Sequence, residues 1–176
     1  MITERLTIPT GTPFSVIDLA AHCRVEGWGE DEITLHAQAA VAELEQYAQL
    51  ALLTQTIRVT LDAWPRGHCL TLPIAPVIDP VSVTITVDGT AFHGFAVLTG
   101  LRPALRLTGA MPCGVIVIEY QAGFGDTAAD IPRDLSLGIM DQTSASFDMR
   151  GAGDGKTNGM SPHMARIAAR YRRVAL

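Results

Sequence analysis

The sequence predicts an α+β protein in which a helical core of about four helices contains an inserted small antiparallel β-domain. Apolar residues recur at helical spacing up to residue 53, alternate with polar residues from 55 to 122, and return to helical spacing afterwards. Turns that contain proline or glycine separate the short alternating segments. Because helical segments lie on both sides of the strands, the β-domain is expected to interrupt one helical core.

Residues 1–54 are expected to form the N-terminal helical part of this core. Ser15 followed by Asp18 is an acidic variant of the capping box, which indicates the start of a helix, and two nearby glycines end that helix. A second helix is expected over residues 31–50. Its apolar residues fall on one face at helical spacing: Ile33, Ala37, Ala40, Val41, Leu44 and Ala48.

Residues 55–122 are expected to form the inserted β-domain. In the segment QTIRVTLDAW, Ile57 points to one face and Arg58 to the other, which is the period of a strand. Asp88-Gly89 follows the alternating segment VSVTITV and indicates a hairpin turn. Further strands are expected in the segments HCLTLP, AFHGFAVL, ALRLTG and GVIVIEYQAG.

The remainder of the chain is expected to be mainly helical. A core helix is predicted within 123–150, a glycine-rich linker over 151–160, and a C-terminal helix over 161–176. Ser161-Pro162 opens the last helix, because serine is a favoured cap and proline suits the first helical position.

Composition excludes several classes of protein. The chain has 176 residues and a formal net charge of −5, whereas a general nucleic-acid-binding protein is usually basic. The three cysteines are widely spaced with no CxxC pair, which fits a reducing cytoplasm. No signal peptide and no apolar run of about 20 residues is present, so we expect assembly in the cytoplasm and no membrane association.

Motifs that suggest ligand chemistry have simpler explanations. GAGDGKT, over 151–157, resembles a phosphate-binding loop, but Arg150 stands where the first glycine is required. That segment also follows a predicted helix and not a strand, so a linker is the better interpretation. His22-Cys23 and His68-Cys69 are adjacent pairs whose side chains diverge, and no metal site is expected from them.

A small hydrolase is the alternative from another class, using Cys113 or the carboxylates Asp126, Asp130 and Asp134. The sequence offers no nucleophile elbow or other local signature of a hydrolase. We favour helix capping and a favourable helix-dipole interaction for the carboxylates, and we predict no catalytic residue, no cofactor and no metal.

The C-terminal helix carries a strong charge asymmetry. No acidic residue occurs from Ser161 to the end, although the protein as a whole is acidic. From the residues alone, a solvated helix end and a docking helix for an acidic partner are equally good interpretations. The residues concerned are Arg166, Arg170, Tyr171, Arg172 and Arg173.

Three long stretches together carry a resemblance to a known family. They are LAAHCRVEGWGEDEITLHAQAAVAELEQY, then LTQTIRVTLDAWPRGHCLTLPIAPVIDPVSVTITVDG, then VIVIEYQAGFGDTAADIPRDLSLGIM, and they cover most of the chain. Their combination, with "LDAWP", "LPIAPV" and "YQAGFG" followed by "IP", resembles the head–tail connector (adaptor) proteins of long-tailed phages, prophages and gene transfer agents. The chain departs from the family in its small, polar segment TSASFDMRGAGDGKTNG, where relatives often continue a charged helix.

The resemblance implies a structural, non-enzymatic viral protein in the neck of a virion or phage-like particle, assembled in the bacterial cytoplasm. It implies a ring, expected to be dodecameric, that binds the portal protein on one side and a stopper or tail-terminator protein on the other. The C-terminal residues named above become the expected portal-binding residues. DNA would pass through the ring without specific binding, which suits an acidic subunit. Another tail-assembly component, such as a stopper or completion protein, remains the closest alternative.

Overall fold

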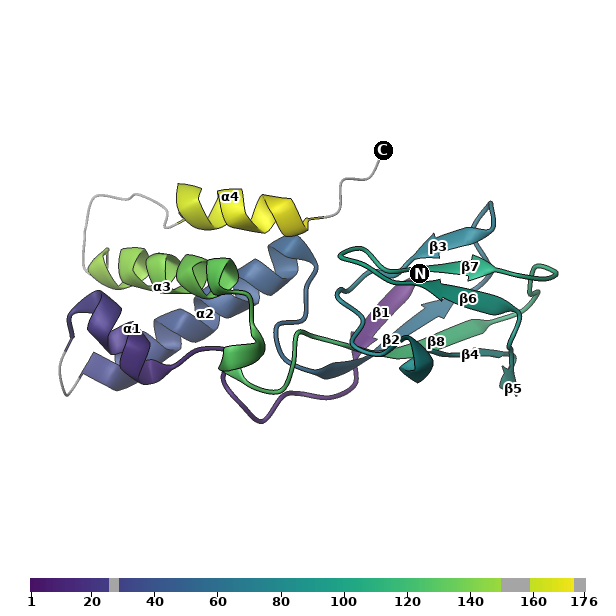
Figure 1. Ribbon diagram of the computed structural model, residues 1–176, viewed down its shortest axis with the longest axis horizontal. Coiled ribbons are helices and arrows are strands. Elements are labelled where there is room, and N and C mark those ends of the chain that lie inside the picture. The colour runs from purple at the N-terminus through teal and green to yellow at the C-terminus, as the bar shows by residue number, and fades with distance from the viewer. Residues whose placement is uncertain (26–28, 150–158, 173–176) are drawn as a thin grey trace. The chain divides into compact units, whose positions relative to one another are not determined.

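The computed structural model describes residues 1–25, 29–149 and 159–172, and it divides into two compact units (Figure 1). The β unit comprises Met1–Thr10 and Leu50–Asp126, and the helical unit comprises Gly11–Gln49 and Thr127–Leu176. The α+β class and the insertion of strands between helical segments are confirmed. No helix in the described ranges is long and apolar enough to cross a membrane.

The β unit contains two antiparallel sheets among its described residues. The larger sheet has the order β1-β2-β8-β4-β5, and the smaller has the order β3-β7-β6. The strands are β1 Ile2–Arg5, β2 Gln55–Leu61, β3 Cys69–Thr71, β4 Thr84–Val87, β5 Thr90–Ala91, β6 Phe95–Leu98, β7 Ala104–Leu107 and β8 Ile116–Ala122.

The central pair of the larger sheet, β2 and β8, explains the alternation in the sequence. Ile57 lies opposite Tyr120 and Val59 opposite Ile118, and all four side chains are almost fully buried. Arg58 lies on the other face, where its Nε donates to the carboxylate of Glu119 at 2.7 Å. One face of the sheet therefore forms the core, and the other carries paired charges.

The first strand differs from the boundary expected from the sequence, which assigned residues 1–54 to the helical part. In the structure, β1 pairs with β2 at the edge of the larger sheet, and Leu6 N–H continues the pairing to Thr56 O at 2.8 Å. All four residues of β1 are exposed. The strand is therefore held by backbone hydrogen bonds and by Arg5, whose guanidinium donates to Leu50 O and to Gln55 Oε1, both at 3.0 Å.

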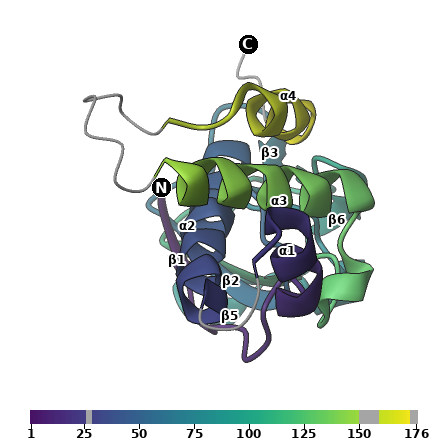
Figure 2. The ribbon, with the colours of Figure 1, turned by 90° about the vertical axis from the view of Figure 1, so that its left-hand side faces the viewer.

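The helical unit is built from four helices in its described residues: α1 Val16–Cys23, α2 Glu30–Ala48, α3 Arg133–Asp148 and α4 Pro162–Tyr171. α3 lies between α1 and α4 (Figure 2). Ser15 caps α1, because its Oγ accepts the N–H of Asp18 at 3.3 Å, as the sequence predicts. Phe14, Leu19, Ile33, Ala37 and Phe147 form the buried cluster that joins α1, α2 and α3.

Candidate interaction surface

The start of α4 is fixed by its cap and by a buried glutamine of α3. Ser161 Oγ accepts the N–H of Met164 at 3.1 Å and Pro162 occupies the first turn, which confirms the predicted helix start. Gln142, which is 2% exposed, accepts the N–H of Ser161 at 2.6 Å and donates to Gly159 O at 3.4 Å. The entry to α4 is therefore tied to α3.

One face of α4 packs within its own subunit. Met164, Ile167 and Ala168 are buried, and Gly138 of α3 lies beside Met164 and Ile167. A Cβ atom at Gly138 would lie 3.4 Å from Ile167 Cδ1. The apolar face is consequently already occupied, and only the polar face of α4 remains for a partner.

The predicted portal-binding residues separate into two groups in the structure. Arg166 and Arg170 are exposed and lie one turn apart on the outer face of α4. Tyr171 and Arg172 instead make contacts inside the subunit. Arg173 lies outside the described residues.

Tyr171 is bonded to the first turn of α3. Its hydroxyl donates to both carboxylate oxygens of Asp134, at 3.0 and 3.1 Å. Burial, followed by the hydrogen bond to Asp134, raises the pKa of Tyr171 to about 12. The raised pKa extends the pH range over which the phenol is protonated and donates to the carboxylate.

Arg172 contacts the end of α2. Its guanidinium carbon lies 4.8 Å from the centre of the Tyr47 ring, which is the geometry of a cation–π interaction. Its own N–H donates to Ala168 O at 2.9 Å and closes the last turn of α4. The C-terminal end of α4 is thus attached to both α2 and α3.

A second polar cluster connects α1, α3 and α4, and the sequence analysis did not predict it. Asp141 of α3 lies between His22 of α1, whose Nε2 is 3.1 Å from Oδ1, and His163 of α4, whose Nδ1 contacts Oδ2. These residues are far apart in the sequence and carry no shared motif, so nothing local could have identified the cluster. Among the described residues, no group of side chains is arranged to hold a metal ion.

We expect Asp141→Asn to lower the free energy of unfolding of the protein by about 1 kcal/mol, because both histidines lose a carboxylate acceptor while partial exposure screens the loss. The side chains of Asp141 and its partners are about a third exposed, at 30% and 33%. Urea denaturation at pH 6 would measure the change. Asp62→Asn, in the exposed turn after β2, is the matched control. Equal stability of both variants would contradict a structural role for the cluster.

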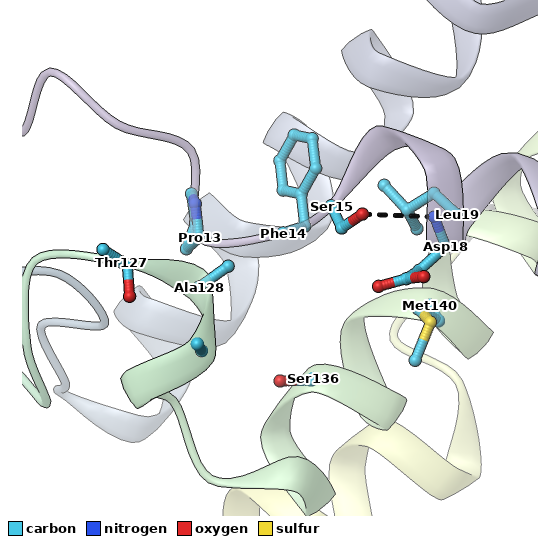
Figure 3. Close-up of a pocket in the computed structure, with 10 residues that line it drawn as sticks. Pro13, Phe14, Ser15, Asp18, Leu19, Thr127, Ala128, Ser136 and Met140 are labelled. Carbon is cyan, nitrogen blue, oxygen red and sulfur yellow. Dashed lines mark hydrogen bonds between the residues drawn. The ribbon is translucent and has the colours of Figure 1, made fainter.

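A pocket of about 380 Å³ lies elsewhere on the helical unit, next to the start of α1 (Figure 3). Phe14, Leu19 and Met140 provide apolar walls, while Asp18 and Ser136 add polar groups. The Oγ of Ser15 points to the N–H of Asp18 and is therefore used for capping.

The other candidate residues from the sequence analysis are the carboxylates, the cysteines and the loop-like motif. Asp130 accepts the N–H and the hydroxyl of Thr127 in a capping arrangement, as the capping interpretation expects. Cys69 and Cys113 are exposed, while burial raises the pKa of the half-buried Cys23. The loop-like motif over 151–157 lies outside the described residues.

Comparison with known proteins gives matches among solved structures. No protein-family model matches the sequence, and no curated protein matches it. A chain in the virion of a native gene transfer agent particle is 25% identical, with a TM-score of 0.81 over 100% of this chain and 97% of that one. A chain in the neck of an empty gene transfer agent particle, computed with C6 symmetry, is 26% identical with the same TM-score and coverage.

A third match is a chain in the neck of the native particle computed with C12 symmetry, at 25% identity and a TM-score of 0.78. It too covers 100% of this chain and 97% of its own length. The similarity thus extends over both units and not over one motif. The chain has the fold of a structural protein from the neck of gene transfer agent particles, and its place is the neck of such a particle or of a phage-like relative.

Proposed function

We propose that this protein is the head–tail adaptor: it forms a ring, with twelve copies as the expected number, between the portal protein and the stopper or tail-terminator protein. The full-length similarity to chains of gene transfer agent necks is the observation that carries the proposal. The C12 symmetry of one of those necks supports a dodecamer. The role is assembly, without a reaction or a cofactor.

The charge distribution supports contact with an acidic portal surface. The chain carries a net charge of −5, yet α4 exposes Arg166 and Arg170 with no acidic residue on the helix. Arginine forms strong, directional hydrogen bonds with carboxylates and carbonyl oxygens. An acidic subunit would also let DNA pass through the ring without binding its phosphates.

The helical unit favours an adaptor over a stopper. A stopper is expected to be mainly β, whereas here α1 to α4 build a unit with its own buried cluster. The mass and shape of the purified protein, alone and mixed with portal protein from the same genome, test the proposal. A ring that caps portal supports the adaptor, while a subunit that ignores portal and binds a tail-tube protein would indicate a stopper.

Removal of the C-terminal helix is a poor test of portal binding. Deletion of residues 163–176 would remove Met164 and Ile167 from the core and uncover Gln142 of α3. From the packing of α4, we expect a destabilised helical unit, so surface substitutions are the sharper experiment.

We expect the double variant Arg166→Gln/Arg170→Gln to bind portal about 10- to 100-fold more weakly at low salt, because two charged contacts are lost. Its free energy of unfolding should stay within about 0.5 kcal/mol of the wild type, since both side chains are exposed. Titration of labelled portal at several salt concentrations would measure this. Arg66→Gln, in an exposed turn of the β unit, removes one charge as a control. Equal binding by all three proteins would exclude α4 as the portal contact.

A further inference from the structure

The polar side chains on and just after the second half of α4 make two different kinds of contact. Arg166, Arg170 and Arg172 are all exposed, but Arg172 also stacks over Tyr47 of α2, and the partly buried Tyr171 bonds to Asp134 of α3. We call the Tyr171–Asp134 and Arg172–Tyr47 contacts the α4 clamp. The clamp lies directly beside Arg170 in the sequence, at the end of the helix where fraying would otherwise begin.

The helix needs such an attachment. α4 has 10 residues, which is too short for stable helix formation in water without tertiary packing. Its cap and Gln142 hold the first turn, and Met164, Ile167 and Ala168 hold the middle. Beyond Ala168, the clamp supplies the side-chain contacts that the structure describes between the end of α4 and the helices beneath it.

The Tyr171–Asp134 contact is suited to this task at neutral pH. Both carboxylate oxygens lie within 3.1 Å of the phenol oxygen, and a hydrogen bond to a charged acceptor is stronger than a neutral one. The Arg172 guanidinium lies over the Tyr47 ring of α2, although Arg172 is the C-cap residue and has already left the helix. Two independent contacts therefore fix the direction in which Arg170 projects.

We infer that Tyr171, Asp134, Tyr47 and Arg172 are positioning residues, which hold Arg166 and Arg170 in a fixed arrangement for carboxylates on the portal. This inference rests on the proposed function and changes the role of Tyr171 and Arg172 from portal contact to internal anchor. A preorganised pair of arginines loses less conformational freedom on binding than a frayed helix end does. Loss of the clamp should therefore weaken binding although both arginines remain.

The test compares Tyr171→Phe with Arg170→Gln in titrations of portal at several salt concentrations. Tyr171→Phe should weaken binding about five- to tenfold with an unchanged dependence on salt, because it removes no charge. Arg170→Gln should weaken binding and also flatten the salt dependence. Circular dichroism must show the same helix content for each variant at the assay temperature.

Conservative variants separate positioning from a general loss of stability. Tyr47→Phe retains the ring beneath Arg172 and should bind like the wild type, whereas Tyr47→Leu should weaken binding. Asp134→Ala combined with Tyr171→Phe should bind no more weakly than the worse single variant, since both changes remove the same hydrogen-bonded contact.

Two results would overturn the inference. The first is portal binding by Tyr171→Phe that equals the wild type while Arg170→Gln is impaired, which would leave the arginines as contacts without a clamp. The second is a Tyr171→Phe variant that flattens the salt dependence as much as Arg170→Gln does, which would make this position part of the charged contact itself. Normal portal binding by both arginine variants would instead contradict the proposed function of α4.

Discussion

Gly123→Ala is expected to destabilise the protein by about 3 kcal/mol or more, because the new methyl group would meet backbone and not flexible side chains. Its Cβ would lie 2.7 Å from the carbonyl carbon and oxygen of Leu53 and from Thr54 N. Gly123 also has φ +146, a conformation that residues with a side chain rarely adopt. Strain and steric overlap therefore act together.

The backbone around Gly123 has little freedom to move away. Gly123 N–H donates to Pro76 O at 3.0 Å, and the next residue, Phe124, donates to Leu52 O at 3.1 Å. Thr54 N–H donates in turn to Gly125 O at 2.9 Å. A shift that relieves the clash would break hydrogen bonds between two buried chain segments.

Chemical denaturation of Gly123→Ala beside two control variants measures this effect. Gly67→Ala tests strain alone, since Gly67 has φ +105 but a Cβ there would meet no described atom within 4 Å. Gly109→Ala has comparable open space among the described atoms and no such backbone strain. If Gly123→Ala were no less stable than Gly67→Ala, the contact with Leu53 would be unimportant.

Local signals in the sequence predicted much of the fold. Ser15 and Ser161 are caps whose oxygen atoms accept N–H groups three residues later, so each helix start depends on neighbouring residues only. The Asp88-Gly89 hairpin is local in the same way: both residues have positive φ, at 49° and 81°. The two-residue period of β2 follows from one buried face and is likewise visible without knowledge of its partners.

Features that depend on distant partners were not predictable from the sequence. β1 is four residues long with every side chain exposed, so no hydrophobic period marks it as a strand. It is identified only by its pairing with β2, more than fifty residues along the chain. The α4 clamp also depends on residues that are distant in the sequence, because Tyr171 and Asp134 are separated by 37 residues.

The motifs that carried the family resemblance prove to be a structural junction in the β unit. "LPIAPV" and "YQAGFG" lie side by side: Val77 pairs with Ala122, and Ile78 N–H donates to Gln121 O at 3.1 Å. These motifs therefore specify how one segment packs on β8. They indicate a fold through the packing of these two segments.

Tyr120→Phe is expected to cost about 2 to 3 kcal/mol, because Tyr120 satisfies both backbone groups of Ile74 in this junction. Its hydroxyl donates to Ile74 O at 3.0 Å and accepts Ile74 N–H at 3.2 Å, and the tyrosine is 1% exposed. Phenylalanine would fill the same space but leave a buried N–H and C=O without this partner. Burial also raises the pKa of Tyr120 well above its usual value, so the neutral hydroxyl is retained.

Urea denaturation of Tyr120→Phe beside Tyr47→Phe would test this expectation, since Tyr47 is only partly buried. The loss should appear as a lower midpoint with an unchanged slope, because the fold itself is retained. A loss below about 0.5 kcal/mol would mean that water replaces the hydroxyl at Ile74. The larger loss would instead establish that the Tyr120 hydroxyl adds to the backbone hydrogen bonds that hold the segment before β4 to β8. The pairing of "LPIAPV" with "YQAGFG" would then be explained by the free energy of the two buried hydrogen bonds between Tyr120 and Ile74.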